Sequence, residues 1–163
     1  MGRKESRIQS WTSRFLLTIF IIFTTQNLIS SPVDDHQERF EDVALKIWEY
    51  AELGYLEEKS SGLLQQELED SGFTIQSGIA GIPTAFIAEY NNGGPVLGIL
   101  GEFDALPGLS QQNVPFKTAE GLSSANGHAC GHHLFGAASA WAVVAIKEWL
   151  EESGTPGTIR FYG

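Results

Sequence analysis

Three segments of the chain carry apolar residues at the spacing of an α-helix. In residues 34–52, apolar side chains recur every three or four positions between acidic ones, which predicts an amphipathic helix. A second helix is predicted from about Ser60 to Gly72, where a glycine can take the left-handed conformation that ends a helix. Residues 134–150 are apolar over most of the helix circumference, so we expect this helix to be buried.

Short apolar runs elsewhere predict β-strands. An Asn-Gly pair within residues 91–94 separates two of these runs and predicts a hairpin that pairs them. The run after this turn has no polar alternation, which is typical of a strand covered on both faces in a layered α/β sheet. The predicted strands are residues 73–76, 84–90, 95–100 and 158–162.

The first 33 residues differ in character from the rest of the chain. Four basic side chains precede or border an uncharged apolar run at residues 15–23, which is the layout of a secretory signal peptide. The run is shorter than the roughly 20 residues that span a bilayer, so we expect a cleaved signal and no stable membrane insertion. The predicted organisation is a signal over residues 1–33 and one domain over residues 34–163. Such a protein is exported to the periplasm or secreted, or is cytoplasmic if the apolar start is a mistaken one.

The net charge of the chain excludes one class of binding partner. The formal net charge is −10, and without residues 1–33, which hold four basic side chains and one acidic, it becomes −13. A surface of this sign repels a phosphate backbone, and no basic stripe interleaved with aromatic residues offers an exception. We therefore expect no nucleic-acid partner.

A cluster of cysteine and histidine is the main candidate for chemistry. Cys130 is the only cysteine, and His128, His132 and His133 lie within three residues of it. A thiolate and an imidazole bind divalent ions such as Zn²⁺, Mn²⁺ or Co²⁺, and the glycine between Cys130 and His132 lets both side chains turn toward one point. We predict Cys130 and His132 as metal ligands. Two ligands do not complete a site, so others must come from elsewhere.

Two other interpretations of this cluster stay open. Cys130 could be a buried structural cysteine whose histidine neighbours cap the following helix. It could also be a nucleophile, with its thiolate favoured by the helix N-terminus and paired with a histidine, although no separate orienting group is evident. Residues 105–127, which lead into the cluster, are rich in Gly, Pro, Ser, Gln and Asn and predict a long surface loop.

Two carboxylates follow the predicted strand at residues 95–100. Glu102 and Asp104 lie at the C-terminal end of that strand, the edge at which ligands and catalytic groups gather in open α/β sheets. One of them could accept a hydrogen bond from a metal-binding imidazole, which fixes the tautomer of the ring and raises its basicity. The alternative is a pair of solvated charges at a strand end.

Four sequence blocks in a fixed order carry a resemblance. They are Ala-Glu-Leu-Gly-Tyr at residues 51–55 with Glu57 and Ser60-Ser61, then residues 78–85, 98–110 and 127–132. With these blocks the chain resembles the amidohydrolase branch of the dinuclear-metal aminoacylase and carboxypeptidase-type metallopeptidases, which includes aminobenzoyl-glutamate and auxin-conjugate hydrolases. The sequences of the second and third blocks most resemble the B-subunit type of aminobenzoyl-glutamate hydrolase.

The resemblance implies a fold and a site. The implied fold is α/β, the N-terminal part of a three-layer αβα metallopeptidase catalytic domain without the lid and dimerisation domain. Cys130 and His132 would bind a divalent metal pair, Mn or Zn with Co as a further possibility, and Asp104 would orient a residue of the metal site. Members of this branch usually carry Asp or Asn after Cys-Gly-His, whereas this chain has His133.

The resemblance also implies an activity. A protein of this family hydrolyses the amide bond of an N-acyl amino acid, such as aminobenzoyl-glutamate, or of a dipeptide, and its full-length form is a homodimer. Its general-base glutamate would follow Gly163, so we expect the 163-residue chain alone to be inactive. The alternative is a short protein that binds metal or forms dimers without catalysis.

Overall fold

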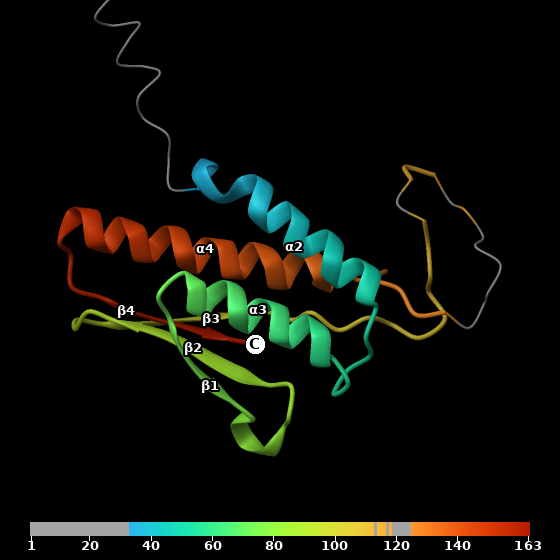
Figure 1. Ribbon diagram of the computed structural model, residues 1–163, viewed down its shortest axis with the longest axis horizontal. Helices are drawn as coiled ribbons and strands as arrows, with labels where there is room; N and C mark the ends of the chain where they lie inside the picture. Colours follow the sequence, from blue (N-terminus) through green and yellow to red (C-terminus); the bar gives the residue numbers. More distant parts are fainter. Residues whose placement is uncertain (1–32, 113, 117, 119–124) are drawn as a thin grey trace, which may run out of the picture. The chain divides into compact units, whose positions relative to one another are not determined.

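The computed structural model describes residues 33–163 except 113, 117 and 119–124, so nearly all of the predicted signal lies outside the described residues. Contacts divide the chain into two units, residues 1–35 and 36–163, and the fold below is that of the second. Among the described residues, no helix combines the length and apolar character that crossing a bilayer requires. In chain order the elements are η1 (Asp34–His36), α2 (Gln37–Tyr50), α3 (Glu58–Asp70), β1 (Thr74–Ser77), η2 (Ile79–Gly81), β2 (Phe86–Asn91), β3 (Val96–Leu100), α4 (His132–Ser153) and β4 (Thr158–Tyr162) (Figure 1).

The four strands form one mixed sheet in the order β1-β2-β4-β3. β4 pairs antiparallel with β2 and parallel with β3, so the predicted hairpin between β2 and β3 is wrong. The backbone at the start of β4 explains the difference, because it bonds to both sides of the Asn-Gly turn. The Asn92 N–H donates to the Gly157 carbonyl at 3.1 Å, and the Thr158 N–H donates to the Pro95 carbonyl at 2.9 Å. The turn therefore joins two strands that β4 separates.

The strand β3 lies at the edge of the sheet. Its apolar side chains Val96, Leu97 and Leu100 are 56%, 51% and 56% exposed. The prediction that this strand is covered on both faces is thus wrong for the described residues. The cause is the sheet order, since β3 has a hydrogen-bonded neighbour on one side only, and within the described part of the chain α4 packs near it without covering these three residues.

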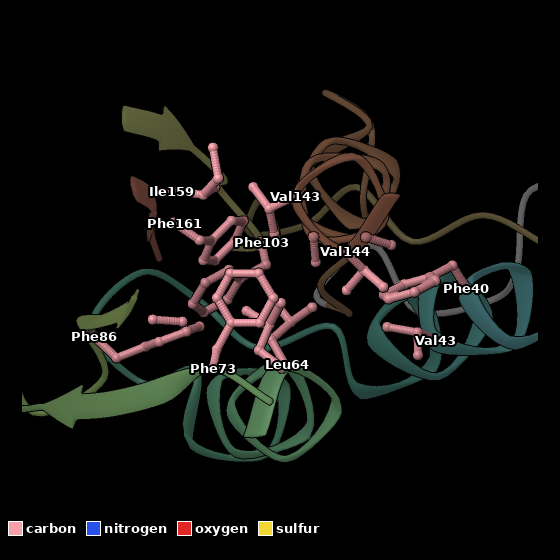
Figure 2. Packing of buried hydrophobic residues seen from close by; sticks show 14 of the residues in the cluster. Phe40, Val43, Leu64, Phe73, Phe86, Phe103, Val143, Val144, Ile159 and Phe161 are labelled. Atoms are coloured by element: carbon pink, nitrogen blue, oxygen red, sulfur yellow. The ribbon is translucent and has the colours of Figure 1, made fainter. Parts of the chain in front are cut away.

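The core lies between the sheet and the helices. α4 packs against α2 and against β4, and α3 packs against β1 and β2, so the helices cover one face of the sheet (Figure 1). Two rings of the sheet, Phe86 and Phe161, are 5.5 Å apart between centroids in this core (Figure 2), and in the helical layer Phe40 of α2 stacks on Trp141 of α4. The side of α4 that faces the sheet and α2 is buried, whereas Leu134, Phe135 and Trp149 are 58%, 41% and 54% exposed, so the prediction of a buried helix is confirmed only in part. The described residues thus provide two layers, a sheet and a helical layer.

The N-terminus of α3 is capped by a side chain from the preceding turn. Glu52 Oε2 accepts hydrogen bonds from the backbone N–H and the hydroxyl of Ser60, both at 2.8 Å, and Glu52 Oε1 accepts one from the Lys59 N–H at 3.0 Å. These bonds satisfy N–H groups that have no partner inside the helix. They also tie the turn at residues 51–57 to α3.

Replacing Glu52 with alanine is expected to lower the free energy of unfolding by about 1–2 kcal/mol, the usual cost of losing an N-cap. Urea denaturation followed by circular dichroism measures the change. Glu69→Ala is the matched control, because Glu69 is exposed in the last turn of α3, where an acid opposes the helix dipole. That control should change stability by less than about 0.5 kcal/mol or raise it slightly. Equal losses in both variants would contradict the capping role of Glu52.

Candidate metal centre

Three side chains from two elements meet at the C-terminal edge of β3. Glu102 and Asp104 follow the last residue of that strand, and His132 is the first residue of α4. One ligand atom of each lies within 4.8 Å of those of the other two, which makes them a group able to hold a metal ion. They meet because β3 and α4 are packed together, with the chain returning through residues 105–127 to begin α4 at this edge.

The contacts of His132 indicate which of its two ring nitrogens can bind a metal ion. Nδ1 of His132 lies 2.6 Å from Asp104 Oδ1, and Nε2 lies 3.1 Å from Glu102 Oε2. When Nδ1–H donates to Asp104, a neutral ring keeps its lone pair on Nε2, the arrangement that suits a metal-binding histidine. Metal bonds of roughly 2.0–2.2 Å to N and O place two ligand atoms of one ion roughly 3–3.4 Å apart. The separation between Nε2 and Glu102 Oε2 therefore fits an ion shared by these two atoms.

The structure brings some of the predicted site residues together and leaves one apart. The expected contact between a carboxylate at this strand end and an imidazole is present, and Asp104 makes it. Cys130 is exposed and joins no group of three potential ligands within the described part of the chain. The turn before α4 accounts for this, because the Gly131 N–H donates to the His128 carbonyl and Gly131 has a φ of +78°. The role of Cys130 as a ligand stays a prediction.

Two further histidines pack beside the centre. The His128 Nε2–H donates to the Ile47 carbonyl at 3.0 Å, and the ring centroids of His128 and His133 are 4.9 Å apart. Burial lowers the pKa of His128, against the opposing effect of the bond to Ile47. Burial, and then repulsion from His128, lowers the pKa of His133 to about 4. Both rings are therefore neutral near pH 7, and among the described residues neither Nδ1 has a hydrogen-bond partner.

Backbone contacts hold the two ends of the predicted loop. The Ala105 N–H donates to the Glu52 carbonyl at 2.7 Å, and Leu106 and Gly127 exchange two hydrogen bonds of 2.9 and 3.0 Å. Gly127, the first residue of the Cys/His motif, has no room for a side chain, because a β-carbon there would lie 2.1 Å from the Leu109 carbonyl oxygen. Backbone hydrogen bonds thus fix both ends of the predicted loop to the rest of the fold.

A cavity of about 290 Å³ opens beside the two strand-end carboxylates. Glu102, Asp104 and Glu57 line it, together with Tyr55 and Thr84. Glu57 was part of a sequence block, but nothing in its spacing marked it as a site residue. An acidic residue just before a helix usually has a simple electrostatic role there. Only the packing of this turn against residues 84 and 101–104 reveals its position.

Asp104→Ala is expected to weaken the binding of Zn²⁺ or Mn²⁺ by about 10- to 100-fold, the usual cost of losing the group that orients a metal-binding histidine. Competition with a chromogenic chelator measures the affinity. Asp70→Ala, on the exposed end of α3, is the control and should leave it unchanged. Unchanged affinity in the Asp104 variant would mean that this carboxylate does not support the centre.

Known amidohydrolases and peptidases are similar to this chain. It is 42% identical over 135 residues to the B-subunit of p-aminobenzoyl-glutamate hydrolase of Escherichia coli (strain K12), covering 83% of this chain and 28% of that protein. It is 30% identical over 98 residues to hippurate hydrolase of Campylobacter jejuni, covering 60% of this chain and 25% of that protein. The chain thus spans little more than a quarter of the length of these relatives. No family model matches it.

A solved structure shares the fold. A dinuclear metal binding peptidase of the M20 family from Bacillus subtilis superposes with a TM-score of 0.63 at 27% sequence identity, covering 77% of this chain and 34% of that one. A second structure, of a putative aminohydrolase from methicillin-resistant Staphylococcus aureus, has the same TM-score at 15% identity and covers 80% of this chain and 32% of that one. The second match bears on the fold alone. The two layers described above therefore correspond to part of a known metallopeptidase domain.

Proposed function

This chain belongs with the metal-dependent amidohydrolases and peptidases of the M20 family, and on that premise we propose what the whole protein does. Its reaction is hydrolysis of the amide bond of an N-acyl amino acid, such as aminobenzoyl-glutamate, or of a dipeptide. The observation that supports this proposal is the position of His132, whose two ring nitrogens face Asp104 and Glu102 beside an open cavity. A metal centre whose two carboxylates line an open cavity is what such a reaction requires.

The residues of the centre have separate roles in this proposal. His132 Nε2 and Glu102 hold the ion, and Asp104 fixes the ring of His132 by accepting the Nδ1 proton. When bound, a divalent metal polarises the amide carbonyl and lowers the pKa of a water molecule toward neutrality. The rings of His128 and His133 contact each other near this centre, and burial, which lowers the pKa of both, keeps them neutral near pH 7.

We further propose the composition of the metal site. A divalent pair is supported by the dinuclear metal binding peptidase to which the chain is similar. Its ions are Mn or Zn, with Co as a substitute, because one imidazole with carboxylates binds all three. In this proposal Cys130 joins the centre once the pair is bound. Neighbouring proposals are export after cleavage of a signal over residues 1–33, and a homodimer as the full-length form.

The experiment compares metal-free and metal-loaded protein on p-aminobenzoyl-glutamate and on hippurate. It uses the 163-residue chain and, beside it, the chain extended to the length of its relatives by any in-frame sequence that follows. We expect hydrolysis in the extended form that a chelator abolishes and that Mn²⁺ or Zn²⁺ restores. Metal should also protect Cys130 from a thiol alkylator. Metal binding without hydrolysis in both forms would support a noncatalytic metal-binding protein instead.

A further inference from the structure

The turn at residues 51–57 is held in an uncommon backbone conformation. Ala51 and Tyr55 have φ angles of +44° and +67°, a left-handed region that side chains other than glycine rarely adopt. Contacts on both flanks maintain it, since Glu52 caps α3 and its carbonyl accepts from the Ala105 N–H, and Asn126 Nδ2 donates to the Ala51 carbonyl at 3.2 Å. Strain of this kind persists where the surroundings impose it, often at ligand sites.

The turn places a buried carboxylate at the wall of the cavity. Glu57 is 8% exposed, and its Oε2 accepts the hydroxyl proton of Thr84, which is itself buried, at 2.9 Å. Among the described residues, no group donates a hydrogen bond to Glu57 Oε1 and no cation pairs with this side chain. A buried charge without a counterpart is costly, so such groups normally meet an ion or a strong donor. Glu57 Oε1 is not among the enclosed side-chain atoms that lack a partner in the described part of the chain, so this oxygen is open to the cavity and available to a bound group.

That oxygen faces the same space as the metal centre. Glu57 Oε1 and Asp104 Oδ2 lie 3.8 and 3.9 Å from the position that a β-carbon would take on Gly54, so both oxygens lie beside this glycine. All charged side chains that line the cavity are carboxylates. Tyr55, which is 70% exposed, also lines the cavity. A group that enters the cavity therefore meets carboxylate acceptors and an exposed aromatic residue.

We propose that Glu57 binds an amino group carried by the acyl part of the substrate, an inference that rests on the proposed amide hydrolysis. A carboxylate oxygen can only accept a hydrogen bond, so it selects an N–H donor, and its negative charge repels a carboxylate or phosphate. Thr84 fixes the carboxylate by holding its other oxygen. The acidic cavity thereby separates amino-bearing acyl groups from unsubstituted ones, while Glu102 and His132 would hold the ion that polarises the scissile carbonyl.

Two kinds of acyl group carry such an amine, an aromatic aminobenzoyl group and an aliphatic aminoacyl group. Both place an N–H donor at Glu57 Oε1, as a neutral arylamine or as an ammonium ion. The experiment separates them by using two pairs of amides, each pair differing only in the amine. The aromatic pair is p-aminobenzamide and benzamide, and the aliphatic pair is alaninamide and propionamide.

Binding of these four amides to the full chain is measured by NMR titration or calorimetry, which requires no turnover. In at least one pair the amino compound should bind about tenfold more tightly, because a hydrogen bond to a buried charge is worth roughly that factor. E57Q should abolish the preference, since the Gln amide can still accept from Thr84 but then turns an NH₂ donor toward the cavity. E58Q makes the same chemical change at an exposed neighbour and should retain it.

Equal binding within both pairs by the wild-type chain would overturn the proposal, and this comparison does not depend on whether any variant folds. Retention of the preference by a folded E57Q chain would also overturn it.

A kinetic comparison then distinguishes failure of the role of Glu57 from failure of the proposed amide hydrolysis. In an active form of the protein, kcat/KM should be about tenfold higher for the amino-bearing substrate of a pair. The two pairs are p-aminobenzoyl-glutamate with benzoyl-glutamate, and alanyl-glutamate with propionyl-glutamate. The E57Q variant should lose this tenfold ratio. Hydrolysis of both members at equal rates would refute the role of Glu57 while leaving amide hydrolysis intact.

Discussion

Replacing His132 with alanine is expected to reduce divalent-metal affinity by more than about 100-fold, beyond the usual loss from an orienting group alone. His132 is the only imidazole in the group of potential ligands found among the described residues. Without it, Glu102 and Asp104 remain as two half-exposed carboxylates, a weak and unselective pair for Zn²⁺. Hydrolysis in an active form of the protein should fall to background with the metal.

The matched control is His36→Ala. His36 pairs with Glu148 at 2.7 Å in a half-buried contact that belongs to neither the metal group nor the cavity. Metal content by elemental analysis and affinity by chelator competition should be unchanged in this variant. If the His132 variant keeps wild-type affinity, the ion is bound elsewhere and the centre described at β3 and α4 is not the metal site.

Local patterns predicted most of the helices and strands. The strand predicted at residues 158–162 is β4 (Thr158–Tyr162), and the three helices are present with boundaries shifted by a few residues. Gly72 has the predicted left-handed conformation, with a φ of +89°. These features depend on side-chain periodicity and on single glycines, which act within one or two turns of the chain. The short stretch of sequence that predicts each of these features therefore also contains its physical cause.

The errors arose where pairing is not local. The Asn-Gly turn and two flanking apolar runs are the usual signs of a hairpin, yet β4 inserts between β2 and β3 from more than sixty residues later in the chain. The same insertion leaves β3 at the edge and its apolar residues exposed. Neither outcome is encoded in the turn itself. Strand order depends on the whole sheet, including where α4 returns the chain.

The candidate site was predictable in part. The rule that functional groups gather at the C-terminal ends of strands identified Asp104, and the histidine-rich motif identified His132. The sequence singled out Glu102 together with Asp104, but only the geometry separates their roles. Asp104 contacts Nδ1 of His132, and Glu102 faces Nε2 of the same ring. Glu57 needed the structure, because its burial and its place at the cavity follow from tertiary packing. The position of Cys130 outside the group reflects a backbone turn that ligand spacing alone does not specify.

Gly136→Ala is expected to lower the free energy of unfolding by about 2 kcal/mol, although alanine is the better helix former. Gly136 lies buried in α4, and a β-carbon there would stand 2.8 Å from the Glu102 carbonyl oxygen and 3.1 Å from Phe103 Cβ. The first of these contacts is with backbone, which cannot turn aside as a flexible side chain would. The helix must therefore move away from the end of β3. We expect this cost to exceed the roughly 1 kcal/mol that alanine contributes to an exposed helix.

The same displacement should weaken the metal centre. His132 lies one helical turn before Gly136, so moving α4 separates its ring from Glu102 and Asp104, and metal affinity should fall by about tenfold. Gly62→Ala is the control, because Gly62 is exposed in α3 and a β-carbon there would meet nothing within 4 Å. That variant should gain about 0.5–1 kcal/mol with unchanged metal affinity. The free energy of unfolding should fall in the Gly136 variant and rise in the Gly62 variant, and only the Gly136 variant should lose metal affinity. That result would establish that the close approach of α4 to the end of β3 sets the geometry of the centre. Stabilisation in both variants would show that α4 can shift without disturbing it.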